Sequence, residues 1–212
     1  MWLARQNRFR LEGEIIHDLA LSVSGLLDDR VGGESIRPPL PSGVAELGYA
    51  GSVKWIESKG GDRYRCGCYI FSQRTVPYPL LMTFDSSDSN VSCARRERSN
   101  TPLQSLTLLN DPAFFECARA FGIRLDTEVT GDPTTRSHEA FRWTTGRVLE
   151  NAELETLVRL YEETRRQLQR QPNDATAIVA GATTPSGSAV DLAASIAFSR
   201  ILLNLDEFFT RE

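Results

Sequence analysis

Hydrophobic residues recur at three- and four-residue steps near the start of the chain. Between Arg5 and Leu27 they follow one side of a helix, and charged residues lie mostly on the other side. The hydrophobic stripe comprises Leu11, Ile15, Ile16, Leu19, Ala20, Val23, Leu26 and Leu27. This spacing predicts an amphipathic helix over residues 5–27. His17 lies at the polar edge of the stripe, so we expect a surface histidine rather than a catalytic one.

A turn-rich arm follows this helix. Glycine and proline interrupt residues 28–62 repeatedly, and no apolar period persists there. Aromatic and aliphatic side chains are nevertheless frequent, and they need to be buried. A structureless loop longer than about 15 residues is usually functional or disordered. We therefore expect residues 28–92 to form a long ordered loop arm, which is the best candidate for a recognition surface.

The second half of the arm has a β-leaning pattern. Residues 64–71 are rich in aromatic side chains, and V-P-Y-P follows at 76–79. Two prolines one residue apart exclude a central strand. The pattern predicts a short edge strand or extended chain, so at most one or two short strands are expected in the protein.

Capping signals divide the remaining residues into helices. Thr101, Pro102 and Gln104 match a helix start, with the hydroxyl at the N-cap, proline in the first turn and glutamine reaching back. Asp111 is expected to end this helix and cap the next one. Further helices are predicted over 134–148, 151–170 and 190–203, with loop and a small helical piece over 171–187.

These patterns give a mainly α fold. We expect an irregular helical domain with a long ordered loop arm, organised as a single domain over residues 1–212. Its parts are the helix at 1–27, the arm at 28–92 and a helical body at 93–212.

Arg95, Arg96 and Arg98 form an arginine cluster. It lies directly before the capped corner, where the helix that starts at Thr101 is followed by the helix capped by Asp111. One interpretation is an anion site, because arginines and a helix N-terminus both favour a phosphate, sulfate or carboxylate. The other, which we favour, is structural: the guanidinium groups hold loop carbonyls and acidic residues such as Asp85 and Asp88. The candidate residues of this site are Arg74, Asp85, Asp88, Arg95, Arg96, Glu97, Arg98, Asn100, Thr101 and Gln104.

Two other functions use residues of the same region. A hydrolase acting on an anionic or polysaccharide substrate could use Asp85, Asp88 and Glu97, but neighbouring arginines would lower their pKa values and disfavour a general acid. Tyr49, Trp55 and Tyr69 could stack on sugar rings, with burial in the core as the favoured alternative. The sequence has no signature of a nucleophile paired with a base, which would indicate an enzyme. A non-catalytic interaction or scaffold module is therefore the first hypothesis.

Composition excludes several partners. The chain has 212 residues and a net charge of −4, so nothing in its overall charge attracts nucleic acid or an anionic membrane. No apolar run is long enough to span a membrane, and no apolar signal core is present. All basic residues except Lys54 and Lys59 are arginine, which suits internal ion pairs but also follows from a genome of high GC content.

Cysteine and histidine give no cofactor site. The four cysteines include Cys66 and Cys68 in C-G-C, and no C-x-x-C-H haem attachment run occurs. Cys66 and Cys68 are only two residues apart, and we do not expect them to bond to each other. Zinc requires four ligands, and only two histidines are present. The oxygen-rich segment 85–90 lacks the ligand spacing of an EF-hand. No metal and no cofactor is therefore predicted.

Several motifs together resemble one known family. They are N-R-F-R-L-E-G-E-I-I-H-D at 7–18, G-V-A-E-L-G-Y-A-G-S-V-K-W at 43–55, R-T-V-P-Y-P at 74–79, T-F-D at 83–85, C-A-R-R-E-R-S-N-T-P-L-Q at 93–104, L-L-N-D-P at 108–112 and L-L-N-L-D-E-F at 202–208. With these motifs the chain resembles the planctomycete-specific domain of unknown function DUF1553. The resemblance spans essentially the whole chain, and the sequence looks like the C-terminal part of that domain.

The resemblance implies a cellular context rather than an activity. Proteins of this kind look exported and multidomain, so we expect a periplasmic or extracellular location although the chain itself carries no signal. Any haem would lie in another domain of the parent protein. Other domains, a protein partner or a polysaccharide are the expected partners. The chain departs from the family pattern at His17, Cys66 and Cys68, which weakens a catalytic, redox or metal role for them.

Overall fold

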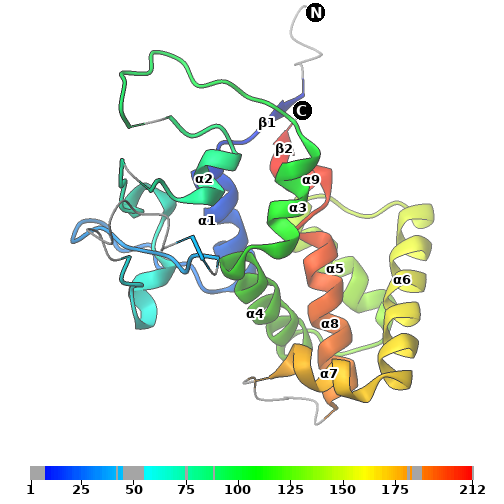
Figure 1. Ribbon diagram of the computed structural model, residues 1–212. Helices are drawn as coiled ribbons and strands as arrows, with labels where there is room; N and C mark the ends of the chain where they lie inside the picture. Colours follow the sequence, from blue (N-terminus) through cyan, green and yellow to red (C-terminus); the bar gives the residue numbers. More distant parts are fainter. Residues whose placement is uncertain are drawn as a thin grey trace, which may run out of the picture. The chain divides into compact units, whose positions relative to one another are not determined.

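The computed structural model describes residues 8–41, 43–44, 55–74, 76–87, 89–180, 182 and 188–211. Contacts divide the described residues into two compact units, one within 1–22, 26–115 and 209–212, the other within 23–25 and 116–208. Helices dominate both units, and the described strands form a two-stranded sheet (Figure 1). The mainly α fold class is confirmed. The prediction of a single domain over residues 1–212 stays a prediction.

The first unit begins with a strand that the sequence did not predict. Strand β1 (Phe9–Arg10) pairs antiparallel with β2 (Thr210–Arg211), and the Leu11 N–H donates to the Phe209 carbonyl at 2.8 Å. Helix α1 (Gly13–Ser24) therefore starts later than predicted. The prediction of a helix from residue 5 was wrong over Phe9–Arg10, because pairing with residues about 200 positions away leaves no local periodicity. Residues 5–7 lie outside the described part.

His17 is buried within α1, with 3% of its surface exposed, so the prediction of a surface histidine was wrong. Its Nδ1 lies 3.1 Å from the Asp18 carboxylate. Burying an imidazole is tolerated when its polar nitrogen is satisfied in this way. The polar edge of a stripe is therefore a poor guide where another segment covers the helix.

The described part of the arm is turns and short helices rather than strand. Two 3-10 helices, Gly60–Tyr64 and Gly67–Tyr69, lie where the sequence predicts a short edge strand or extended chain, and the described part of the arm has only isolated bridges, at Asp28–Arg65 and Ile36–Ile70. A Cβ added to Gly67 would lie 3.0 Å from the backbone of Glu14, so this turn packs directly against α1. Proline then begins helix α2 (Pro79–Thr83), which the sequence prediction had missed.

The capped corner is confirmed. Helix α3 (Pro102–Asn110) has the predicted capping box of Thr101 and Gln104. Helix α4 (Pro112–Glu128) follows, and the Asp111 carboxylate accepts from the Ala113 N–H at 2.9 Å. Pairing each helix start with a side-chain acceptor satisfies backbone donors that the helix leaves unbonded.

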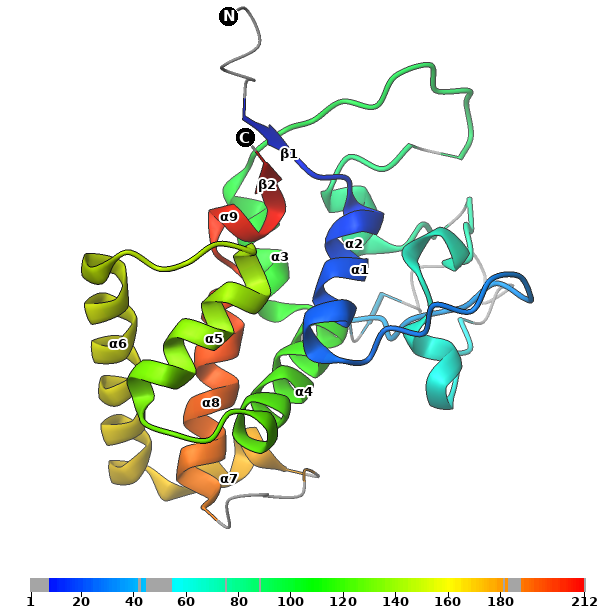
Figure 2. The ribbon, with the colours of Figure 1, turned by 180° about the vertical axis from the view of Figure 1, so that it is seen from behind.

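The second unit is a cluster of helices. After α4 come α5 (Pro133–Thr145), α6 (Asn151–Arg170), α7 (Pro172–Val179), α8 (Ala189–Leu202) and the short α9 (Asp206–Phe209). Figures 1 and 2 show α6 and α8 side by side, with α7 near one end of the pair. A Cβ on Gly122 of α4 would lie 2.8 Å from the backbone of Ile196, so α4 and α8 approach closely.

Local chemistry sets the ends of these helices. Helix α5 stops before the predicted residue 148, because Gly146 adopts a left-handed φ of 78° and ends it. Over 171–187 the predicted small helical piece is α7, which Pro172 begins. Among the described residues, no helix combines the length and the apolar character that crossing a membrane requires.

Candidate functional site

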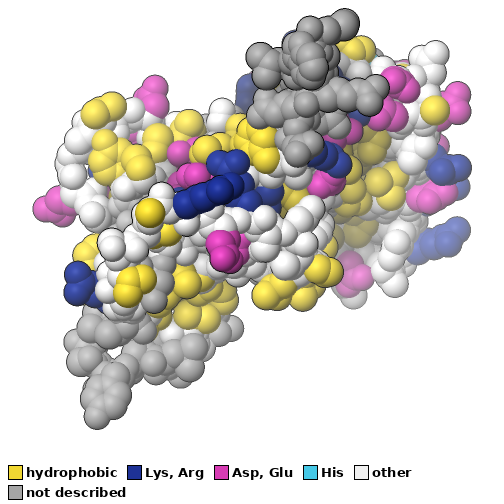
Figure 3. All heavy atoms as spheres, turned by 90° about the horizontal axis from the view of Figure 1, so that it is seen from above, with side chains coloured by type: hydrophobic (Ala, Val, Ile, Leu, Met, Phe, Trp, Pro, Cys, Tyr) yellow, Lys and Arg dark blue, Asp and Glu magenta, His cyan; other side chains and the backbone are white. Residues whose placement is uncertain are grey.

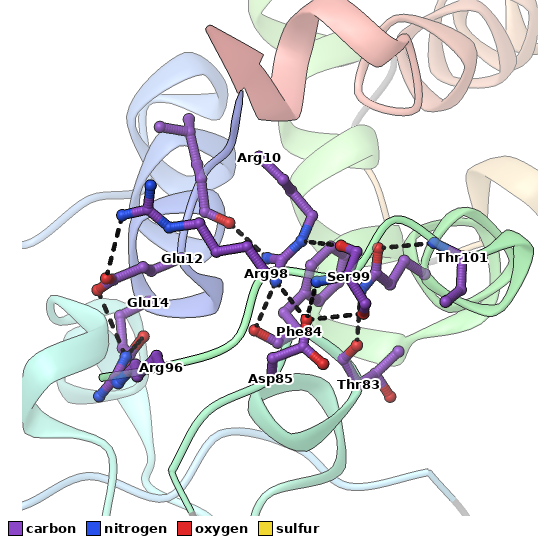
Figure 4. A network of polar contacts seen from close by, with 12 residues as sticks. Arg10, Glu12, Glu14, Thr83, Phe84, Asp85, Arg96, Arg98, Ser99 and Thr101 are labelled. Carbon is purple, nitrogen blue, oxygen red and sulfur yellow. Dashed lines mark hydrogen bonds and ion pairs between the residues drawn. The ribbon is translucent and has the colours of Figure 1, made fainter. Parts of the chain in front are cut away.

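Asp85 is the centre of a polar network in the first unit (Figure 4). Its Oδ2 atom accepts hydrogen bonds from Arg10 Nη2 at 2.6 Å, from the Ser99 N–H at 2.8 Å and from Ser99 Oγ at 2.7 Å. Asp85 follows α2 and has a φ of 58°, the left-handed region that non-glycine residues seldom adopt. The carboxylate thus holds the backbone on both sides of the arginine-rich segment.

Arg10 is the residue of this network that sequence reasoning missed. It is 4% exposed, and besides Asp85 it donates to the carbonyls of Ser99 at 2.6 Å, Leu11 at 2.5 Å and Phe84 at 3.2 Å. Its guanidinium also lies 5.3 Å from the centroid of the Phe84 ring. A planar group with five donors can make all these contacts together. The available signal was R-F-R in the first motif, which the predicted helix concealed.

Gln104 connects the start of α3 to the same network. It is 1% exposed, its Oε1 accepts from the Thr101 N–H at 3.2 Å, and its Nε2 donates to the Thr83 carbonyl at 3.0 Å and to Ser99 Oγ at 3.1 Å. The capping residue therefore joins α3 to the end of α2. The structure brings Asp85, Thr101 and Gln104, three of the candidate residues, together around Ser99.

The arginine cluster pairs with acids that sequence reasoning did not name. Arg96 Nη1 lies 2.8 Å from Glu14 and 3.4 Å from Glu12, both at the start of α1. Arg98 lies 3.8 Å from Glu12, and its guanidinium is 5.1 Å from the centroid of the Phe9 ring. Asp85 is paired with Arg10, and Asp88 lies outside the described residues. Arg96 and Arg98 of the cluster therefore pair with acidic residues at the start of α1 rather than with Asp85 or Asp88.

An open hollow lies beside the arginine cluster. Its volume is about 1020 Å³, and Glu12 and residues 93–99 line it. Arg95 and Glu97 are exposed, and the described residues give neither side chain a hydrogen bond or an ion pair. The space-filling view in Figure 3 shows a group of adjoining Lys and Arg side chains near its centre, with acidic and apolar side chains beside it. Among the described residues, the hollow therefore offers the guanidinium of Arg95 and the carboxylate of Glu97 without such a partner.

Two other candidates are not part of the network. Arg74 and Asn100 are exposed, and within the described ranges neither side chain joins the contacts around Asp85. The structure therefore concentrates the candidate site on α1, the end of α2 and the start of α3.

The aromatic candidates of the arm are engaged within the protein. Trp55 Nε1 donates to the Pro38 carbonyl at 2.8 Å, and its ring stacks on Tyr78 with centroids 6.0 Å apart. The Arg65 guanidinium lies 3.8 Å from the centroid of Tyr69, whose hydroxyl accepts from the Gly32 N–H at 2.7 Å. Tyr49 lies outside the described residues. A sugar ring would have to compete with these contacts.

Arginine over an aromatic ring recurs in both units. In the described part, Arg10, Arg37, Arg63, Arg65, Arg98, Arg124 and Arg147 each lie over an aromatic ring. Such contacts occur roughly once per 70 to 80 residues in proteins generally. The density here gives the arginine bias a physical role that lysine would fill less well.

The electrostatics of Asp85 limit its chemistry. Burial alone would raise the pKa of its carboxyl, but the hydrogen bonds from Ser99 and the charge of Arg10 outweigh burial and lower that pKa. A carboxylate in this state holds no proton at neutral pH, so it cannot act as a general acid. Its Oδ2 atom already accepts three hydrogen bonds, so that atom is not open to take a proton from a substrate. Asp85 is thus suited to holding loops in place.

The described residues contain no group of three or more His, Cys, Asp or Glu side chains placed to hold a metal ion. All four cysteines lie in described segments, and no disulfide joins them.

Comparison with known proteins gives a family. A search of curated proteins and a search of solved structures each found no match. The model of one family, described as PSD1, a protein of unknown function (DUF1553), matches residues 1–161, well over half of the chain. This chain therefore belongs to the DUF1553 family.

Proposed function

We propose that this chain is a non-catalytic interaction or scaffold module. The observation that carries the proposal is the state of Asp85, whose Oδ2 accepts three hydrogen bonds and whose pKa is lowered. The strongest candidate for an acid or base is used to hold the arginine-rich segment. The arginine-rich segment itself remains accessible. Arg95 and Glu97 are exposed, while Arg96 between them pairs with Glu14 of α1.

The exposed charges favour recognition of a polar protein surface. A segment anchored at Arg96 and Asp85 loses little conformational entropy on binding, so its exposed side chains can form ion pairs at low cost. Mixed charge on both partners sets the orientation of a complex more than its affinity. Other domains of the parent protein are the partners that we propose, with a separate protein or a polysaccharide as the alternatives.

One experiment separates this proposal from a hydrolase. The chain is tested with nitrophenyl esters, phosphates, sulfates and glycosides, alongside Asp85→Asn. We expect no turnover by either protein and a lower unfolding free energy for the variant. Turnover by the unchanged chain that disappears in a still-folded Asp85→Asn would overturn the proposal.

A second experiment tests the interaction directly. The neighbouring domains of the parent protein are produced separately and titrated with this chain by calorimetry. Reversing an exposed interfacial charge in Arg95→Glu should weaken binding roughly fivefold. Arg159→Glu makes the same charge change on the exposed face of α6 and should leave binding unchanged. Equal effects of the two variants, or no binding at all, would contradict the proposed surface.

The cellular context is part of the same proposal. The resemblance to planctomycete proteins supports an exported, multidomain parent with haem in a separate domain and a periplasmic or extracellular location. The reading of the full gene tests this: an upstream export signal and a C-x-x-C-H motif outside this chain are the expected result.

A further inference from the structure

Two arginines of the cluster, Arg96 and Arg98, reach the same carboxylate. Arg96 Nη1 lies 3.4 Å from Glu12 Oε2, and Arg98 Nη2 lies 3.8 Å from Glu12 Oε1. Figure 4 shows both contacts at the start of α1. The Glu12 carboxylate therefore marks a point on which two positive side chains converge.

The contacts of Glu12 with both guanidinium groups are long. A charge-assisted hydrogen bond between a nitrogen and a carboxylate oxygen is about 2.7 to 2.9 Å long, which is shorter than either contact. Glu12 is also accessible to solvent, with 38% of its side chain exposed. A carboxylate held in this way can turn towards solvent and leave its position to another anion.

Most donors of the two arginines have no acceptor among the described residues. Arg96 contacts Glu12 and Glu14 through Nη1 alone, which leaves its Nε and Nη2 without an acceptor in the described part. Arg98 donates no hydrogen bond there, because its contact with Glu12 at 3.8 Å is too long for one. A guanidinium has five N–H donors in a planar fork, so both side chains can still bind the oxygens of an anion.

Contacts other than those with Glu12 hold the two guanidinium groups in place. Arg96 pairs with Glu14 at 2.8 Å, and the Arg98 guanidinium lies 5.1 Å from the centroid of the Phe9 ring. Phe9 belongs to β1, which is paired with β2. Movement of Glu12 would therefore leave both arginines positioned. Donors that are already positioned lose little entropy when they bind a ligand.

The position of Glu12 is open to a larger anion. Glu12, Arg96 and Arg98 all line the hollow of about 1020 Å³. The start of α1 favours negative charge at this position, because a helix N-terminus carries a partial positive charge. A tetrahedral oxyanion has more oxygens than a carboxylate, so it can bind both guanidinium groups together.

We propose that Arg96 and Arg98 bind one tetrahedral oxyanion, a sulfate or phosphate group, in place of the Glu12 carboxylate. Glu12 is then an internal competitor of the ligand, and binding is noncovalent. The structural role favoured from the sequence applies to Arg96, which Glu14 anchors, while Arg98 keeps its donors for the ligand. This inference does not depend on the proposed function, which rests on Asp85 and on the exposed charges beside this point.

The test is a calorimetric titration of the full chain with sodium sulfate and with sodium phosphate. Sodium chloride keeps the ionic strength constant, so that a general salt effect does not count as binding. We expect one sulfate or phosphate to bind per chain, with saturation. Phenyl sulfate and phenyl phosphate carry the same groups as esters, and they distinguish a ligand held through an ester from a free ion.

Glu12→Gln gives the most specific result. The substitution removes the competing negative charge, and it should raise the affinity for sulfate roughly threefold to fivefold, because an exposed ion pair contributes up to about that factor. A Glu12 that only supports the structure would leave the affinity unchanged or lower it. Glu155→Gln makes the same change on the exposed face of α6 and should not affect binding.

Arg98→Gln should lower the affinity for sulfate about tenfold, since it removes charge-assisted hydrogen bonds. Arg159→Gln removes an exposed arginine of α6 and is the matched control, with unchanged affinity expected. Thermal unfolding of each variant confirms that it is folded. Three results would each overturn the proposal: no saturable binding, equal affinities of Arg98→Gln and Arg159→Gln, or a Glu12→Gln chain that binds sulfate no more tightly than the unchanged chain.

Discussion

Arg10 shows at the scale of one residue why this chain uses arginine. Its guanidinium contacts a carboxylate, three carbonyls and an aromatic ring from a nearly buried position. Lysine has three donors at a single point and no planar face, so it could satisfy only part of this set. The buried carbonyls that a lysine could not reach would lose their hydrogen bonds, each of which contributes about 1 kcal/mol.

Arg10→Lys should therefore lower the unfolding free energy by about 2 to 3 kcal/mol, since two or three hydrogen bonds are lost. Chemical denaturation followed by circular dichroism measures the change. Arg95→Lys is the matched control: its side chain is exposed and should change stability by less than about 0.5 kcal/mol. Equal stabilities of the two variants would show that the network around Asp85 contributes nothing particular.

Asp111 gives a pH dependence with a defined sign. Burial raises the pKa of its carboxyl above 3.8, although the N–H groups of Ala113 and Phe114 and the charge of His17 partly oppose this. The unfolded chain therefore loses this proton at lower pH than the folded chain. As pH rises through the interval between the two pKa values, ionisation of Asp111 costs stability.

Asp111→Asn should remove this cost while keeping an oxygen acceptor for the helix N-terminus. The stability of the unchanged chain relative to the variant should decrease as pH rises from 3 toward neutrality. Unfolding free energies of both proteins at each pH measure the difference. An advantage of the aspartate that grows with pH would mean that its carboxyl is favoured as the anion.

At the scale of elements, helix starts were predictable and the arm was not. Thr101, Gln104 and Asp111 act within a few residues of themselves, so their caps could be read from the sequence. The turn at Cys66–Tyr69 depends instead on contact with Asp18 and Glu14, about 50 residues earlier. Aromatic residues favoured a strand there because strand propensity reports a half-buried environment, not a backbone preference.

Gly67→Ala tests the contact between this turn and α1. The new Cβ would lie 3.0 Å from the Glu14 backbone, and overpacking of this kind costs about 1 to 3 kcal/mol. Gly61→Ala is the control, because its nearest atom is a side-chain oxygen of Asp28 at 3.8 Å. Denaturation of both variants gives the comparison. A Gly67→Ala protein as stable as Gly61→Ala would mean that the turn can move away from α1.

At the scale of the whole molecule, acids paired with arginine make stability depend on pH. Arg147 binds Glu153 and Glu207 in the second unit, and its hydrogen bonds lower the pKa of Glu153 from 4.5 to about 2. Because the folded pKa is the lower one, the stabilisation is present above pH 4.5 and is lost as pH falls toward 2.

Glu153→Gln should remove part of this dependence. Between pH 5 and pH 2 the unfolding free energy of the variant should fall less steeply than that of the unchanged chain. Glu155→Gln changes an exposed glutamate of the same helix and is the control, with the slope expected to stay unchanged. Parallel slopes for all three proteins would show that the pair with Arg147 does not contribute.

Much of the helical architecture was therefore accessible from sequence, while the partners within the candidate site were not. Arg95, Arg96 and Arg98 were recognised as a cluster, but Glu12 and Glu14 lie more than 80 residues away in the chain. Arg10 was concealed because a two-residue strand carries no periodic pattern. The many arginine and acidic residues of the chain make ion pairs expected, but only the fold determines which pairs form.

The pairing of β1 with β2 places residues 9 and 211 opposite each other. Two fluorophores attached at residues 9 and 211 would therefore lie close together and transfer energy efficiently. An unfolded chain of this length has a radius of gyration of about 50 Å. Loss of that transfer would report the opening of the sheet. The same closeness of residues 9 and 211 favours circular permutation, in which a linker joins these positions and new termini are placed in an exposed loop.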